Sequence, residues 1–125
     1  GLSCLALGKM RMAKECELLV RQNMNDYSSN DVSYVEIFLA RMDELNGRTT
    51  EAVARLADRI QEYRDRDFFC ANRLEVERLR MLATCSPALA HEAAVNIRPR
   101  LLAARARPLV ERLDRILART AALLS

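Results

Sequence analysis

The chain has few of the residues that interrupt helices or build sheets. Among its 125 residues are three glycines, three prolines, three tyrosines and three phenylalanines, and there is no tryptophan. Runs of the β-branched and aromatic residues that favour strands are nearly absent. Ala, Leu, Arg and Glu are frequent instead, and these residues suit a helix. The composition therefore predicts one modest all-α domain.

Other missing features bear on the cellular compartment of the protein and on metal binding. No apolar run approaches the roughly 20 residues that a membrane-spanning helix needs, and the N-terminal residues lack the pattern of a signal peptide. Cys4, Cys16, Cys70 and Cys85 form no C-x-x-C pair. We therefore expect buried, reduced thiols in a cytoplasmic protein. Because His91 is the one histidine, we expect neither a metal site nor a cofactor.

No catalytic constellation emerges from the titratable residues. His91 stands in the helical stretch "ALAHEAAV", and we expect it on the helix surface or half-buried rather than acting as a base. Two carboxylate pairs, Asp65/Asp67 and Glu75/Glu77, are spaced so that their members point to different helix faces. Three glycines supply no phosphate-binding loop. The sequence thus predicts a protein that is not an enzyme.

Apolar periodicity and turn residues predict a succession of helices. The expected helices cover 2–7, 10–23, 32–45, a segment that follows Thr49 and ends in "EYRDRD", 69–83, a segment that begins at Pro87, and a last segment from Pro108 to the C-terminus. Gly47 should end the helix at 32–45, and Thr49 and Ser86 should cap the helices that follow them. Pro99 should end or kink the helix that starts at Pro87.

Short stretches of the sequence recur at a regular interval. Gly8 and Gly47 are 39 residues apart, and so are Ala13 and Ala52. Further echoes link "VEIFLARM" (35–42), "LEVERLRM" (74–81) and "VERLDRILA" (110–118). A helix pair cannot bury its apolar face alone, so repeated pairs are expected to stack as a solenoid.

These residues resemble the tetratricopeptide repeat (TPR) family over 1–97. Leu39-Ala40, Gly47 and Ala52 stand at the family's spacing, whereas Glu36 and Asp43 replace its usual aromatic residues. The resemblance implies a short right-handed α-solenoid of antiparallel helix pairs. The expected organisation is one domain, a fragment of a larger protein, with repeats at about 1–28, 29–67 and 68–105 and a capping helix at 108–124.

The resemblance also implies a non-catalytic protein-interaction scaffold, as the regulatory or sensor part of a larger signalling or transcription regulator. The family's partner-binding groove falls, in this sequence, on Tyr34, Ile37, Arg41, Arg73, Val76 and Arg80. Arginines in such a groove suit a protein or peptide partner with an acidic segment or a C-terminal carboxylate. The alternative, that these residues are solvated helix surface, stays open.

Positive charge gathers near the C-terminus. Residues 98–119 carry seven arginines and two acidic residues, whereas 1–97 have a net charge of −2. The arginines are Arg98, Arg100, Arg105, Arg107, Arg112, Arg115 and Arg119. Three interpretations stay open: a solvated face on a capping helix, docking on an acidic partner or a second copy of the chain, and nucleic-acid binding. No aromatic residue lies in the segment for base stacking, which disfavours nucleic acid.

Overall fold

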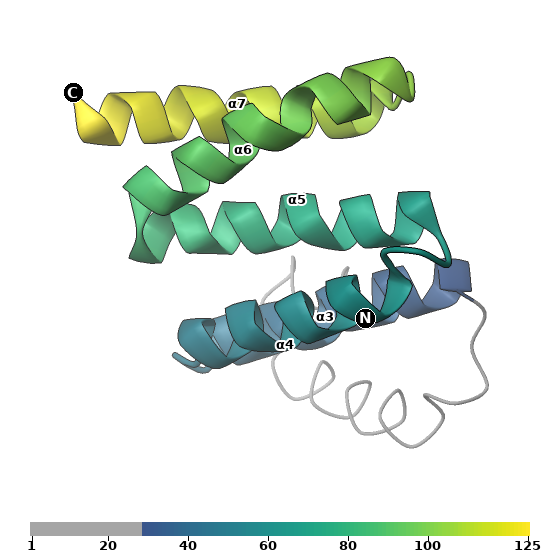
Figure 1. Ribbon diagram of the computed structural model, residues 1–125. Helices are drawn as coiled ribbons and strands as arrows, with labels where there is room; N and C mark the ends of the chain where they lie inside the picture. Colours follow the sequence, from purple (N-terminus) through teal and green to yellow (C-terminus); the bar gives the residue numbers. More distant parts are fainter. Residues whose placement is uncertain (1–28) are drawn as a thin grey trace. The chain divides into compact units, whose positions relative to one another are not determined.

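A computed structural model describes residues 29–125, which form five α-helices joined by short connections (Figure 1). The helices are α3 (Ser29–Leu45), α4 (Thr49–Tyr63), α5 (Phe68–Cys85), α6 (Pro87–Ala103) and α7 (Arg107–Leu124). No strand occurs in this part of the chain, so the prediction of an all-α fold is confirmed for it. The helices expected at 2–7 and 10–23 lie outside the described residues.

The chain divides into two compact units between Leu74 and Glu75, within α5. In the first unit, α3 and α4 form a hairpin, and its core also includes the first turns of α5. Fully buried apolar side chains here are Leu39, Ala40, Met42, Ala52, Leu56, Cys70 and Leu74. Ala40 and Ala52 are two of the small residues that carry the TPR resemblance, and their burial fits helices that approach closely.

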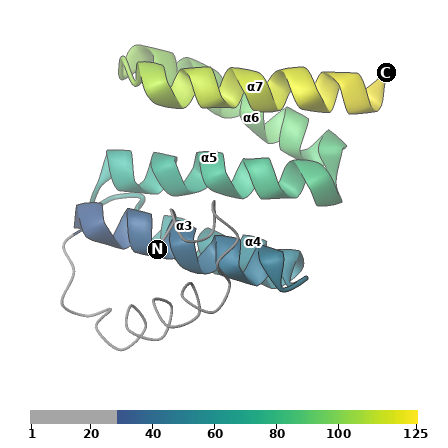
Figure 2. The ribbon, with the colours of Figure 1, turned by 180° about the vertical axis from the view of Figure 1, so that it is seen from behind.

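The second unit contains the rest of α5 and the hairpin of α6 and α7 (Figures 1 and 2). Its fully buried apolar residues are Leu79, Met81, Ala90, Ala94, Leu101 and Leu113. Helix α7 is amphipathic: Leu109, Leu113 and Ile116 are buried, while Arg112, Arg115 and Arg119 are exposed. Each burial of a large aliphatic side chain contributes about 1.5–3 kcal/mol, so the apolar face holds α7 in place.

A Schellman turn joins α3 to α4, as Gly47 predicted. The Gly47 N–H donates to the carbonyl of Glu44 at 3.1 Å, and the Arg48 N–H donates to that of Asp43 at 2.8 Å. Gly47 has a φ of 77°, in the left-handed region that lacks a penalty only for glycine. The residue therefore stops α3 and turns the chain back along it.

The turn between α6 and α7 has the same hydrogen bonds but no glycine. The Arg105 N–H donates to the carbonyl of Leu102 at 3.0 Å, and the Ala106 N–H donates to that of Leu101 at 3.1 Å. Arg105 has a φ of 57°. An arginine thus stands in the left-handed position that Gly47 takes in the other hairpin, at a cost of about 1–2 kcal/mol.

Proline and capping signals are only partly realised. Pro108 stands in the first turn of α7, and Pro87 opens α6 with Ser86 before it at the N-cap position. The side chain of Ser86 makes no cap hydrogen bond, and α4 begins at Thr49 itself, with Arg48 at its N-cap. The predicted caps by Thr49 and by the Ser86 hydroxyl are therefore wrong.

Pro99 was expected to end or kink α6, and it does not end the helix, which continues to Ala103. Pro99 cannot donate the usual hydrogen bond to the carbonyl of Val95. Both Pro99 and Val95 lie on the exposed face of α6, where water can hydrate that carbonyl. The interruption is thus tolerated within the helix.

One burial prediction needs correction. The cysteine at the end of α5, Cys85, is exposed rather than buried, whereas Cys70 is buried.

The two Schellman turns predict opposite effects of substitution. Gly47→Ala should lower the free energy of unfolding by about 1 kcal/mol, and Arg105→Gly should raise it by about 1 kcal/mol, because only glycine adopts positive φ without strain. A Cβ at Gly47 would meet no atom within 4 Å, so the loss of stability in Gly47→Ala would not come from a steric clash. Urea unfolding followed by circular dichroism measures both values.

The matched control is Ala104→Gly, at the neighbouring position with an ordinary φ of −81°. It should not be stabilising, because glycine there only adds entropy to the unfolded chain. If Arg105→Gly were as destabilising as Ala104→Gly, the left-handed strain at Arg105 would be contradicted.

Candidate functional site

Two of the six predicted groove residues meet on the surface of the first unit. The guanidinium of Arg73, on α5, stacks over the ring of Tyr34, on α3, with 5.0 Å between its central carbon and the ring centroid. Arg73 also donates to the hydroxyl of buried Ser33 at 2.7 Å. Tyr34 is 55% exposed, so one side of this cation–π pair faces solvent.

The other four predicted groove residues are placed differently. Ile37 and Val76 are buried, each 4% exposed, and so are not accessible to a partner. Arg80 binds the carboxylate of Glu77 on its own helix at 2.9 Å. Arg41 is half-exposed and engaged in an interaction of its own. The structure therefore brings together only the pair on α3 and the start of α5.

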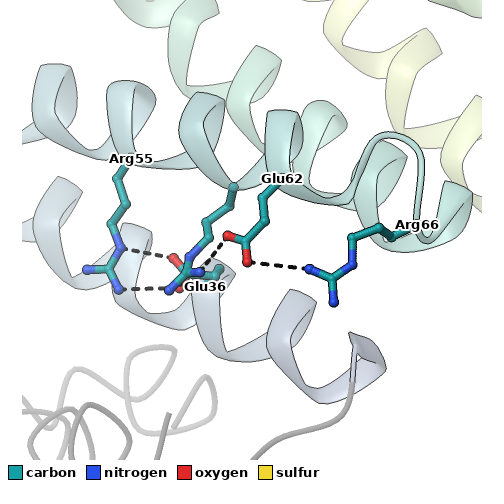
Figure 3. Close-up of polar contacts among 5 residues, drawn as sticks. Glu36, Arg55, Glu62 and Arg66 are labelled. Atoms are coloured by element: carbon teal, nitrogen blue, oxygen red, sulfur yellow. Dashed lines mark hydrogen bonds and ion pairs between the residues drawn. The ribbon is translucent and has the colours of Figure 1, made fainter. Parts of the chain in front are cut away.

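A buried carboxylate connects α3 to α4. Glu36 is fully buried, and its two oxygens accept hydrogen bonds from Arg55 Nε at 2.9 Å and Arg59 Nε at 3.1 Å. A longer contact from Arg55 Nη2, at 3.5 Å, makes that pairing two-pronged. Figure 3 shows Arg55 reaching down from α4 onto Glu36 of α3. Two cations thus compensate the single buried anion, as burial of a charge requires.

The same arginines extend the contact to the surface. Arg59 Nη1 donates to Glu62 at 2.8 Å, and Glu62 lies 3.8 Å from Arg66 (Figure 3). Burial acts to lower the pKa of the Arg59 guanidinium, but the hydrogen bond to Glu62 and the charge of Glu36 outweigh it, so the pKa is raised. Arg55 and Arg59 are thus paired with carboxylates of the first unit and leave little positive charge for a ligand.

Cys70 is shielded from chemistry by its position in the first unit. Its side chain is buried, and this burial, reinforced by the charge of Asp67, raises the pKa of the Cys70 thiol to about 11. The thiolate is the reactive form of cysteine. Cys70 therefore acts as a small apolar core residue, as predicted for the cysteines.

His91 links the two helices of the second unit. Its Nδ1 lies 2.7 Å from Oγ1 of Thr120, which is fully buried on α7. The Thr120 hydroxyl donates its one hydrogen to the carbonyl of Leu117 at 3.1 Å. The contact joins α6 to α7, and the half-buried position of His91 is as expected.

The basic residues of 98–119 separate into engaged and unengaged arginines. Arg98 forms an ion pair with Asp114 at 2.8 Å, and its hydrogen bond lowers the pKa of that carboxyl. Arg119 donates a long hydrogen bond, 3.5 Å, to the hydroxyl of Thr84. The others bind no carboxylate within 29–125 and are exposed: Arg100, Arg105, Arg107, Arg112 and Arg115. They are a local excess of positive charge.

A cavity of about 440 Å³ lies at the turn between α6 and α7. Leu102, Ala106 and Val110 line it with apolar surface, and Arg105 and Arg107 stand beside them. Val110 and Ala106 are buried, while Leu102 is half exposed. An apolar hollow next to two unengaged arginines is the arrangement in the second unit best suited to hold a ligand.

Residues 29–125 offer neither a metal-binding cluster nor a membrane-spanning helix. No group of three or more His, Cys, Asp or Glu side chains stands close enough to hold a metal ion in this part of the chain. None of the helices from α3 to α7 combines the length and the apolar character that crossing a membrane would require.

The sequence alone missed the Glu36 pair and the cavity. Arg55 and Arg59 stand four residues apart, on one face of α4, and that spacing signals a possible shared anion. In the sequence, Glu36 stands out only as a departure from the TPR pattern. The cavity has no sequence signal, because it forms where residues of α6, α7 and the turn between them come together in space.

Because Glu36 is buried and charged, removing its two arginine partners should cost more stability than removing the carboxylate itself. Replacing both arginines, Arg55→Met with Arg59→Met, should lower the free energy of unfolding by about 3–5 kcal/mol, because it leaves a buried carboxylate uncompensated. Glu36→Gln should cost only about 1–2 kcal/mol, since both guanidinium groups can turn to water. Urea unfolding of the wild type and of the two variants measures these free energies.

The control is Glu62→Gln, which removes only exposed ion pairs and should change stability by less than about 1 kcal/mol. A smaller loss for the arginine pair than for Glu36→Gln would show that Glu36 is not the charge on which this contact depends.

The raised pKa of Cys70 predicts a pH dependence of stability. The folded chain holds the thiol proton more tightly than the unfolded chain, so this contribution is complete below pH 9.0 and is lost as the pH rises toward about 11. The urea midpoint of the wild type should therefore fall more steeply across this range than that of Cys70→Ala. Parallel curves for the two proteins would contradict the burial of the thiol.

No protein-family model, curated protein or solved structure matches this chain. The TPR resemblance therefore rests on the residues of the sequence alone, and a TPR-like identity is a proposal.

Proposed function

We propose that the protein is a non-catalytic interaction module that binds an acidic segment of a partner protein through the α6–α7 hairpin. The observation that carries this proposal is the group of five exposed arginines without a carboxylate partner in the described chain. Residues 75–125 hold nine arginines and five acidic residues. A carboxylate-rich partner would neutralise this charge through bidentate hydrogen bonds.

The contrast with the first unit supports the assignment. There the buried carboxylate of Glu36 engages Arg55 and Arg59 from the same hairpin. On the α6–α7 hairpin most of the arginines are exposed one by one, and the ion pair with Asp114 balances Arg98 alone. Charge that no internal group balances is available to steer an oppositely charged partner to this surface.

A protein partner accounts for the surface better than nucleic acid. The segment 98–119 has no aromatic side chain on which bases would stack. The cavity beside Arg105 and Arg107 is lined by apolar groups, and a phosphate backbone offers nothing to fill it. Self-association stays an alternative, because Leu123 and Leu124 at the end of α7 are exposed.

The wider TPR-like interpretation belongs to this proposal. In it, the helix pairs are parts of a short right-handed solenoid within a larger cytoplasmic signalling or transcription regulator. Its support is the use of the same Schellman turn in the α3–α4 and α6–α7 hairpins. The exposed Tyr34–Arg73 pair is a second surface for a carboxylate in this interpretation, on helices that would line the family's groove.

Affinity capture from a nuclease-treated cell extract tests the function. Wild-type protein is expected to retain an acidic partner that Arg112→Glu with Arg115→Glu loses at least about ten-fold, because two attractive charges become repulsive. The control is Arg64→Glu, the same reversal at one exposed arginine of the first unit, and it should retain the partner. Tyr34→Ala reports whether the second surface contributes.

Two outcomes would contradict the proposal. One is a partner held equally well by the wild type and by the charge-reversed hairpin. The other is wild-type protein that binds duplex DNA or RNA, with affinity falling steeply as salt is added, and captures no protein. A dimer that dissociates on reversal of Arg112 and Arg115 would identify the partner as a second copy of the chain.

A further inference from the structure

We infer that the cavity at the α6–α7 turn is an anchor pocket for one large apolar side chain of an acidic partner segment, with Arg105 and Arg107 binding the carboxylates beside that side chain. The inference rests on the proposed function and deepens it. Arg105 and Arg107 would contact the partner segment, and the motif expected in that segment is an aliphatic or aromatic residue flanked by Asp or Glu.

The size and lining of the cavity set the kind of group that fits. Its volume of about 440 Å³ is at the lower end of binding pockets, which span roughly 300–1,000 Å³. Leu102, Ala106 and Val110 offer it only apolar side chains. An apolar side chain moved from water to this lining gains free energy in proportion to the area it buries.

The two arginines at the cavity would bind the carboxylates of the partner segment. Arg105 and Arg107 are both exposed, and neither binds a carboxylate within residues 29–125. They flank Ala106, so their two guanidinium groups start from positions on either side of one lining residue. This charge complementarity selects an acidic segment over a neutral or basic one with the same apolar residue.

The turn itself fixes the arginine at this place. Arg105 occupies the left-handed position where Gly47 stands in the other hairpin. Arg105→Gly therefore removes the guanidinium while relieving the backbone, and it should not unfold the protein. A loss of binding in a variant at least as stable as the wild type cannot be ascribed to unfolding.

The test uses the full chain and two fluorescent peptides. Each is a short run of Glu, Asp, Ser and Gly, with a central leucine in one and a serine in its place in the other. By fluorescence anisotropy, the wild type should bind the leucine peptide about ten-fold more tightly than the serine peptide, from burial of one aliphatic side chain. Leu102→Gln should abolish this preference.

Arginine variants separate the pocket from the surrounding charge. Arg105→Gly and Arg107→Gln should each weaken the leucine peptide about three- to ten-fold, through loss of a charge-assisted hydrogen bond. Arg115→Gln makes the same change of charge on α7 at a residue that does not line the cavity. It should weaken binding less than about two-fold. Unfolding curves confirm that each variant is folded.

The outcomes distinguish a failure of the anchor pocket from a failure of the proposed function. If the two peptides bind equally, or if Arg115→Gln is as harmful as Arg105→Gly, the anchor pocket is overturned and the general binding of acidic segments stands. If neither acidic peptide binds the wild type, while a capture partner is lost on reversal of Arg112 and Arg115, the pocket alone fails. If both experiments fail, the proposed function fails with it.

Discussion

Compensation of buried carboxylates by arginine is the constraint that organises this chain. Glu36 has no access to water, and a lone charge there would cost several kcal/mol. Arg55 and Arg59 meet that requirement from the neighbouring helix and in doing so join α3 to α4. Asp43 is similarly held by Arg48, at 2.8 Å, across the turn that follows α3. In the first unit, arginine therefore contributes mainly to internal contacts.

The second unit repeats this pairing between Arg80 and buried Glu77, but most of its arginines lie elsewhere. Its hairpin is joined by apolar packing, by the hydrogen bond of His91 to Thr120 and by the single ion pair of Arg98. Most of its other arginines are exposed and bind no carboxylate within residues 29–125. Because such an excess repels itself, a surface of this kind gains most from an acidic partner. The cavity beside Arg105 gives that partner an apolar point of attachment.

The sequence predicted most of the helices because their signals are local. Gly47 and Pro108 act through their own backbone, and the apolar face of α7 follows from helical spacing. Signals that depend on surroundings were less decisive: Pro99 does not end α6, because its face of the helix is solvated. The excess of arginine near the C-terminus could likewise be counted from the sequence. The pairing of Glu36 with residues 19 and 23 positions later was not, since it depends on how two helices cross.

Chemical-shift mapping of the backbone amides and arginine side chains is the most direct test of the claim that the α6–α7 hairpin binds acidic segments. The full chain is titrated with the acidic leucine peptide at low salt. We expect the largest shift changes on the turn from Leu102 to Val110 and on the side chains of Arg105 and Arg107, while the signals of Arg55 and Arg59 stay unchanged. Changes centred on α3 and α4, or spread evenly over every exposed arginine, would contradict it.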